Sequence, residues 1–178
     1  MDGVKRPFIF AVVLTFVTLP LQCATLERLT LDDMIAKSPV IERATVVSSY
    51  AAAEGSLIFT HYRLQVTERY KGVAVSEIVV PGGTANNVKQ FVAGAPQFQP
   101  GDEFVFFLWT SQSGLTWVTG LTQGLFTVPP GGDSDPVLSR AASHELMLDR
   151  TTGHAVQDQT LTMKLSDLRT RIARGAAQ

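Results

Sequence analysis

The chain has 178 residues, with 16 acidic and 15 basic residues and a net charge of −1. No run of like charges occurs, whereas a nucleic-acid surface shows a basic patch or stripe, so the composition argues against nucleic-acid binding. A chain of this length buries about 68–70% of its unfolded surface, so one domain is enough to form a core without disulfides.

Residues 1–24 have the pattern of a secretory signal peptide. Two basic residues stand near the start, an apolar core runs from residue 8 to residue 21, and small residues end the segment. The apolar core is shorter than the about 20 residues that a spanning helix needs, so an uncleaved membrane anchor is the less favoured alternative. We expect cleavage between Ala24 and Thr25, and a secreted or periplasmic mature chain.

The single cysteine, Cys23, opens a second possibility, since a cysteine at the end of an apolar signal can become the lipidated first residue of a lipoprotein. Gln22 argues against a lipid anchor, because that processing prefers a small residue before the cysteine. If cleavage follows Ala24, the mature chain has no thiol and no disulfide. We expect residues 25–178 to form a single domain without a membrane span.

The mature chain is predicted to begin with a short helix. Thr30 is a suitable cap, Asp33 stands at the third helical position, and Pro39 ends the helix. The apolar pattern then changes to a period of two, which is typical of half-buried strands. Strands are expected at residues 44–50 and 57–70. Residues 51–56 between them are short enough to form the turn of a hairpin.

A further strand is expected at residues 75–80, and its exit through "PGG" raises the question of a phosphate-binding loop. Such loops deliver backbone N–H groups to the anion and usually carry Lys and Ser or Thr after the glycines. Pro81 has no N–H group, and no such pair follows. We therefore expect Gly82 and Gly83 to turn the chain, with a positive φ at one of them or both.

The densest apolar segment runs from Phe104 to Trp109 without interruption. A continuous run bounded by turns predicts a strand buried on both faces, at the centre of the core. Ser166 is the expected cap of a helix near the C-terminus, and Gly175 closes it. Additional strands are expected at residues 115–120, 124–128 and 137–141. The fold class is mainly β: an OB-like β-barrel or a small sandwich, bracketed by a short N-terminal helix and a C-terminal helix.

The order of these features resembles the OB-like barrel of the tissue inhibitor of metalloproteinases and netrin C-terminal modules. A strand that ends in Tyr-Lys-Gly at residues 70–72 and a Gly-acid-x-aromatic segment at residues 101–104 carry the resemblance, which covers roughly residues 44–120. The resemblance implies the barrel alone. Inhibitors of that family chelate the protease metal through a cysteine at the mature N-terminus, whereas this chain has Thr25 there. The chain also resembles exported bacterial proteins without an established activity.

Catalytic patterns in the sequence are incomplete. The three histidines are scattered, and "HELML" lacks the second histidine that a helical zinc motif needs, so no metal or cofactor is expected; a zinc site built from distant histidines is the alternative. The Gly-x-Ser-x-Gly elbow of serine hydrolases does not occur. Asp102 and Glu103 are neighbours on a predicted strand, so their side chains point to opposite faces. We expect no catalytic residues.

A binding module is the favoured class, because OB-like barrels bind ligands on one strand face and its flanking loops. Six loop residues are candidates to contact sugars or an extended peptide, although they also fit solvated turns and, for one of them, a cap on the core: Asn86, Asn87, Gln97, Phe98, Gln99 and Gln123. The expected function is an exported, non-catalytic binding or accessory module of the cell envelope or extracellular space, with a protein or glycan partner. An envelope hydrolase with a site on the barrel loops is the alternative, and a purely structural accessory protein is the third candidate.

Overall fold

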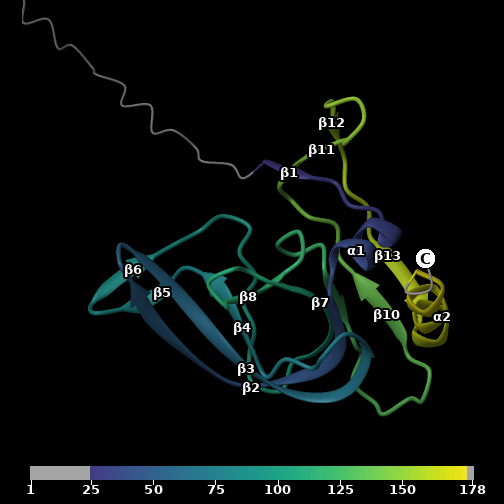
Figure 1. Ribbon diagram of the computed structural model, residues 1–178, viewed down its shortest axis with the longest axis horizontal. Coiled ribbons are helices and arrows are strands. Elements are labelled where there is room, and N and C mark those ends of the chain that lie inside the picture. Colours follow the sequence, from purple (N-terminus) through teal and green to yellow (C-terminus); the bar gives the residue numbers. More distant parts are fainter. Residues whose placement is uncertain (1–24, 176–178) are drawn as a thin grey trace, which may run out of the picture.

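The computed structural model describes residues 25–175, which form thirteen strands and two short helices (Figure 1). The protein is therefore mainly β, as the sequence predicts. The predicted signal peptide, with its cleavage after Ala24 and the lipid anchor considered at Cys23, lies outside the described residues. Between residues 25 and 175, no helix is long and apolar enough to cross a membrane.

The main sheet contains eight strands, and all of its ladders are antiparallel. Its path across the sheet is β13 (Leu161–Lys164), β10 (Val137–Arg140), β9 (Leu125–Thr127), β7 (Glu103–Thr110), β2 (Val40–Glu54), β3 (Leu57–Lys71) and β4 (Glu77–Pro81), while β8 (Thr116–Val118) pairs with β7. Within the described part of the chain, these ladders do not close into a barrel, because β4 and β13 end the path without pairing to each other.

Two smaller sheets lie at the margins of the main sheet. β1 (Thr25–Glu27) runs parallel to β11 (Leu146–Leu148), and β11 pairs with β12 (Ala155–Val156), so that these three strands project together at the top of Figure 1. β5 (Gly83–Ala85) and β6 (Val88–Gln90) form a hairpin at the opposite end of the molecule from the helices.

The first helix, α1 (Leu31–Lys37), confirms the predicted capping box. Thr30 Oγ1 accepts a hydrogen bond from Asp33 N at 3.1 Å, and Asp33 Oδ2 accepts one from Thr30 N at 3.0 Å. Each side chain thereby satisfies a backbone donor that the first helical turn leaves unpaired.

The second helix, α2 (Leu165–Gly175), begins one residue before its predicted cap, so the prediction for Ser166 is wrong. The backbone N–H of Ser166 donates instead to Asp135 Oδ1 at 2.7 Å, and its hydroxyl lies 2.9 Å from Asp135 Oδ2. A carboxylate from the loop before β10 thus occupies the place of a local cap, which sequence spacing does not reveal.

Buried side chains lie on both faces of the central strands β2 and β7. On one face, Ile41 and Phe107 pack against α1 and α2. On the other face, Ala44 and Phe106 pack against residues of β3 and β4. These residues confirm that β7 lies at the centre of the core, buried on both faces as far as Leu108.

The core also contains an acidic side chain, Glu42 on β2, which is fully buried. Its Oε2 accepts a hydrogen bond from Val75 N at 3.0 Å, while Oε1 has no hydrogen-bond partner. Burial raises the pKa of the Glu42 carboxyl above 4.5, and the hydrogen bond from Val75 only partly opposes this. The folded protein therefore binds this proton more tightly than the unfolded chain does.

The substitution Glu42→Gln is expected to stabilise the protein at neutral pH. Because the folded pKa is raised, the stability that protonated Glu42 contributes is fully present below the unfolded pKa and is lost as the pH rises through the folded pKa. The free energy of unfolding of the wild type should therefore fall relative to that of the variant as the pH rises above the unfolded pKa of a glutamate, measured by urea denaturation at several pH values. Glu54→Gln, at an exposed position, is the control. A difference that does not change with pH would contradict the assignment.

Candidate functional site

Two tryptophans stand side by side where β7 emerges from the core. Trp109 and Trp117 are register partners on β7 and β8, with ring centroids 6.5 Å apart and an angle of 23° between the rings. Trp109 is 41% exposed, so the prediction that the buried run extends to Trp109 is wrong at its last residue. Side chains alternate between the two faces of a strand, so Trp109 lies on the same face of β7 as Phe107. Phe107 packs against the helices, whereas Trp109 lies outside the cluster of buried residues that Phe107 forms with them.

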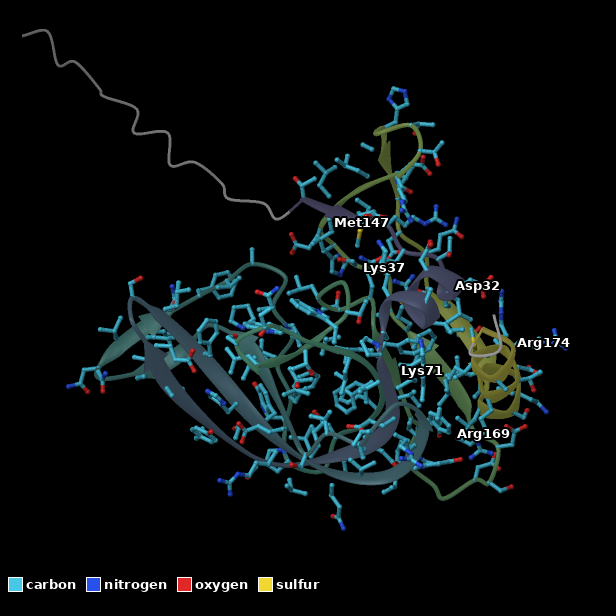
Figure 2. All side chains as sticks on the ribbon, viewed as in Figure 1. Asp32, Lys37, Lys71, Met147, Arg169 and Arg174 are labelled. Atoms are coloured by element: carbon cyan, nitrogen blue, oxygen red, sulfur yellow. The ribbon has the colours of Figure 1, made fainter. Side chains whose placement is uncertain are left out.

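A pocket of about 370 Å³ lies beside Trp109 and is called the Trp109 pocket below. Its walls and rim are formed by Leu26, Glu27, Leu29, Lys37, Trp109, Thr119, Gly120 and Gln123. Lys37, labelled in Figure 2 beneath the projecting sheet, donates to Glu27 Oε1 at 3.1 Å. One aromatic ring, apolar side chains and a few polar groups thus converge on a small concave site, which is the usual make-up of a ligand pocket.

Gln123 builds one wall of this pocket and is 99% buried, with a relative exposure of only 1%. Its Oε1 accepts a hydrogen bond from Leu29 N at 2.8 Å, and its Nε2 donates to Glu27 O at 2.9 Å. Gly120 has a φ of +64°, and a Cβ there would lie 3.0 Å from both Gln123 Nε2 and Leu29 Cδ1. Gln123 therefore holds the segment after β1 against the β8–β9 turn.

Further aromatic side chains continue from the tryptophans onto the outer side of β3. Phe59 meets Trp117 edge-to-face, with centroids 5.4 Å apart. His61, two residues further along β3, stacks on Tyr50 of β2 with centroids 4.6 Å apart and an angle of 9°. Together these five residues, Tyr50, Phe59, His61, Trp109 and Trp117, are called the aromatic face. Tyr50 and Trp109 are its most exposed members, at 45% and 41%.

Charged groups border the Tyr50 end of the aromatic face. Glu77 Oε1 lies 2.9 Å from His61 Nδ1, and the Tyr50 hydroxyl donates to Glu77 at 3.3 Å. The guanidinium of Arg63 lies over the Tyr50 ring, 5.9 Å from its centroid. Desolvation and the adjacent Glu77 carboxylate raise the pKa of Tyr50, so its hydroxyl remains a hydrogen-bond donor.

The structure places the six predicted binding residues in separate regions. Gln123 belongs to the Trp109 pocket. Gln97 and Phe98 line a second pocket of about 350 Å³. The ring of Phe98 is 5% exposed and packs edge-to-face on Tyr62, with centroids 4.9 Å apart, so it belongs to the core at the same time.

The remaining three predicted residues lie in turns. Asn86 and Asn87 have φ values of 51° and 61° and connect β5 to β6, and Asn86 also borders a pocket beside the β2–β3 turn. Both asparagines therefore fill left-handed positions that a tight hairpin requires. Gln99 N donates to Asp102 Oδ2 at 2.7 Å in the turn before β7.

The glycine loop before this hairpin turns the chain as predicted. Gly82 and Gly83 have φ values of 97° and 134°, and a Cβ on Gly83 would lie 2.5 Å from Thr60 Oγ1. Gly82 N donates to Ile58 O at 2.7 Å, and Gly82 O accepts from Thr60 Oγ1 at 2.8 Å. These groups bind the neighbouring strand, which is the role of a turn rather than of a phosphate loop.

The aromatic face is not among the sites that the sequence predicts. One signal was available, because the period of two in β3 puts Phe59 and His61 on the side opposite Tyr62 and Leu64, which face the core. Aromatic residues on the side of a half-buried strand that is turned away from the core indicate either a second packing layer or a binding surface. The pairing of Trp109 with Trp117 depends on the β7–β8 register, which the sequence does not state.

Side chains that could bind a metal ion do not cluster in the described part of the chain. Across residues 25–175, no group of three or more His, Cys, Asp and Glu side chains is placed to hold a metal ion. His61 contacts Glu77, while His144 lies in the loop between β10 and β11 and His154 in the loop between β11 and β12.

Comparison with known proteins adds no family to this description. No protein-family model matches the chain, and no curated protein matches it either.

Proposed function

We propose that the protein is an exported, non-catalytic binding module that holds a glycan on the aromatic face and in the Trp109 pocket. The observation that carries the proposal is the exposed ring of Trp109 at the edge of a concave, partly apolar site. The apolar face of a sugar ring packs against an aromatic ring, while its hydroxyl groups need hydrogen-bonding partners. Glu27 and Lys37 at one end of the site, and Arg63 and Glu77 at the other, offer such partners.

The proposal includes an OB-like arrangement of β2, β3, β4, β7 and β8. The order β2–β3–β4 and the pairing of β7 with both β2 and β8 support it, as does the proximity of β8 to β4. In OB-folds, ligands bind on the face of the second and third strands and on the loops beside it. The corresponding strands here are β3 and β4, and β3 carries Phe59 and His61, which are 9% and 7% exposed and support the rings of Trp117 and Tyr50 above them. The proposed resemblance to netrin-type modules extends to this arrangement and not to protease inhibition.

The charge of the site favours a glycan over a nucleic acid. Proteins that bind single-stranded nucleic acids combine stacking rings with a positively charged groove for the phosphates. Here Lys37 is paired with Glu27, and Arg63 lies 3.9 Å from Glu77, so each cation has an acidic neighbour. An extended peptide that adds a strand needs the unpaired backbone groups at an open edge of a sheet. The aromatic face offers side-chain rings instead, and these suit the apolar face of a sugar.

The same contacts favour binding over hydrolysis. His61 and Glu77 resemble a base and its orienting carboxylate, but His61 is 7% exposed and its Nε2 is buried without a hydrogen-bond partner. A general base must come within hydrogen-bond reach of the proton that it abstracts. The stacked Tyr50 ring covers the imidazole, so the His61–Glu77 pair is better suited to hold Tyr50 in place.

Titration of the mature chain, residues 25–178, with neutral oligosaccharides and with peptides tests the proposal. We expect oligosaccharide binding to change the tryptophan fluorescence. We expect the substitution Trp109→Ala to weaken oligosaccharide binding at least tenfold. Loss of an anchoring tryptophan typically costs about 2 kcal/mol or more, and about 1.4 kcal/mol corresponds to a factor of ten in Kd.

Phe91→Ala is the matched control, because Phe91 is 78% exposed and lies outside the aromatic face. The control should bind oligosaccharides as the wild type does. Binding of peptides alone, or equal oligosaccharide binding by Trp109→Ala and the wild type, would rule out the proposed glycan site.

A further inference from the structure

We propose that the aromatic face binds a linear, extended β-1,4-linked glycan along its length, with Trp109 and Tyr50 as two separate contact points. This inference rests on the glycan proposal and adds the length and the linkage of the ligand. Trp109 and Tyr50 are 41% and 45% exposed, whereas Phe59 and His61 between them are only 9% and 7% exposed. A ligand that contacts both exposed rings must therefore span the buried rings that separate them.

The two exposed rings lie on one face of the main sheet. Trp109 and Trp117 are register partners on β7 and β8, so both side chains point to the same side. The same holds for Tyr50 and His61, which are register partners on β2 and β3. Phe59 lies two residues before His61 on the same side of β3, and its ring meets that of Trp117. This contact joins the two pairs into one row.

The row is several sugar units long. The ring centroids of Trp109 and Trp117 are 6.5 Å apart, and the Phe59 ring lies 5.4 Å further on. His61 follows Phe59 after about 7 Å, the rise of two strand residues, and the Tyr50 ring lies 4.6 Å from the His61 ring. The path between the exposed rings is therefore on the order of 20 Å long. A sugar unit of an extended chain is about as long as one of these steps, so a disaccharide reaches only one exposed ring.

Tyr50 is held in position for such a contact. Its ring stacks on His61, and its hydroxyl donates to Glu77 at 3.3 Å. Arg63 lies over the ring, but the Arg63 side chain is 65% exposed, and exposed cation–π contacts are weak, so a sugar can displace it. The ring itself is fixed before a ligand arrives, and a preorganised contact loses less free energy to ordering on binding.

Two contact points on one ligand raise its affinity without any new contact. Once a chain is held at Trp109, its other end reaches Tyr50 as an intramolecular event, so the second contact is governed by a high effective concentration. This gain requires a ligand that runs straight along the row. A β-1,4-linked chain is extended, whereas an α-1,4-linked chain of the same sugar curls and leaves the face of the sheet.

Calorimetric titration with cello-oligosaccharides and chito-oligosaccharides of two and six units tests this inference. We expect the six-unit chain of at least one series to bind at least tenfold more tightly than the two-unit chain. Maltohexaose, which is the α-1,4-linked isomer of cellohexaose, should show no such gain over maltose. Equal affinities for two and six units, an equal gain in the maltose series, or no binding of either β-1,4-linked series overturns the inference.

The failure of this inference differs from the failure of the glycan proposal. Disaccharide binding that Trp109→Ala weakens, without a gain for longer chains, would overturn the extended ligand and still support a glycan site at Trp109. The absence of binding by any oligosaccharide, linear or branched, would overturn both.

Substitutions at Tyr50 test the second contact point. Tyr50→Ala should lower the affinity for the six-unit chain to about that for the two-unit chain, and leave the affinity for the two-unit chain unchanged. Tyr50→Phe is the matched control, because it keeps the ring and should retain the gain with length. A thermal unfolding curve for each variant confirms that it is folded. If folded Tyr50→Ala retains the full gain with length, Tyr50 is not a contact point and the inference is wrong.

Discussion

Asp158→Ala is expected to lower the free energy of unfolding by about 3–5 kcal/mol, the cost of leaving one partner of a buried ion pair alone. The side chains of Arg140 and Asp158 are only 3% and 1% exposed. Arg140 donates to both carboxylate oxygens, at 2.9 and 2.8 Å, and also to Gln159 O at 2.6 Å. Removing the carboxylate leaves the guanidinium buried without its counter-charge and Ser143 N without its acceptor. Denaturant unfolding at pH 7 measures the loss.

The double variant Arg140→Met/Asp158→Leu should recover much of this loss, because it leaves no uncompensated charge in the interior. Asp32→Ala is the surface control, since the Asp32–Arg171 pair is 72% and 49% exposed and such pairs contribute about 1 kcal/mol or less. A loss for Asp158→Ala no larger than that for Asp32→Ala would show that the buried pair does not hold the β10–β11 segment.

The Arg140–Asp158 pair also makes the stability of the protein depend on pH. Burial acts to raise the pKa of Asp158, but the hydrogen bonds from Arg140 and from backbone N–H groups outweigh it and lower the pKa below 3.8. Because the folded pKa is depressed, this contribution to stability is present above the unfolded pKa and is lost as the pH falls through the folded pKa. The difference between the wild type and Asp158→Ala should therefore be largest near neutral pH and decrease in strong acid.

Phe106→Ala is expected to cost about 3–5 kcal/mol, as truncations of large core aromatics do. Phe106 is fully buried on β7 and lies against the rings of Phe98 and Phe104, with centroids 5.8 and 5.5 Å away. The expected loss combines the lost burial of the ring with a cavity that neighbouring rings, held by their own contacts, cannot fill. Chemical denaturation of the folded variant and of the wild type gives the difference.

Phe91→Ala makes the same chemical change at a position that is 78% exposed. It should alter the free energy of unfolding by no more than about 0.5 kcal/mol, as surface substitutions usually do. Similar losses for the two phenylalanine variants would mean that β7 is not the centre of the core.

The parts of the fold that the sequence predicts are those whose pattern is local. The capping box at Thr30 lies within four residues, and the period of two in residues 57–70 indicates β3 whatever its neighbours are. β1 and β11 have only three residues each and form because they pair with one another. No local pattern in either segment predicts a strand, and the same applies to the distant carboxylate of Asp135 that binds the start of α2.

The candidate site also combines features that a local sequence pattern predicts with features that depend on distant parts of the chain. As a polar residue in a loop, Gln123 is predicted to contact a ligand, and it does line the Trp109 pocket, but its amide holds Leu29 and Glu27. Trp109 ends a continuous apolar run, which predicts a core position, and only the limited extent of the helical layer exposes it. Which of several aromatic residues faces solvent depends on the neighbouring layer, and a single strand contains no information about that layer.

The pairing of β1 with β11 restricts the order in which the protein reaches its final structure. Thr25 pairs with Leu146, so the first described strand has no partner until residues 146–148 have been synthesised. Gln123, which holds the segment just after β1, lies 94 residues beyond Leu29 in the sequence. The β2–β3 hairpin can form early, because its strands adjoin in the chain. The Trp109 pocket is lined by residues 26–37 and 109–123, and its first strand, β1, is supported by β11. A chain that ends before residue 146 should therefore lack this support of the pocket even where it contains both tryptophans.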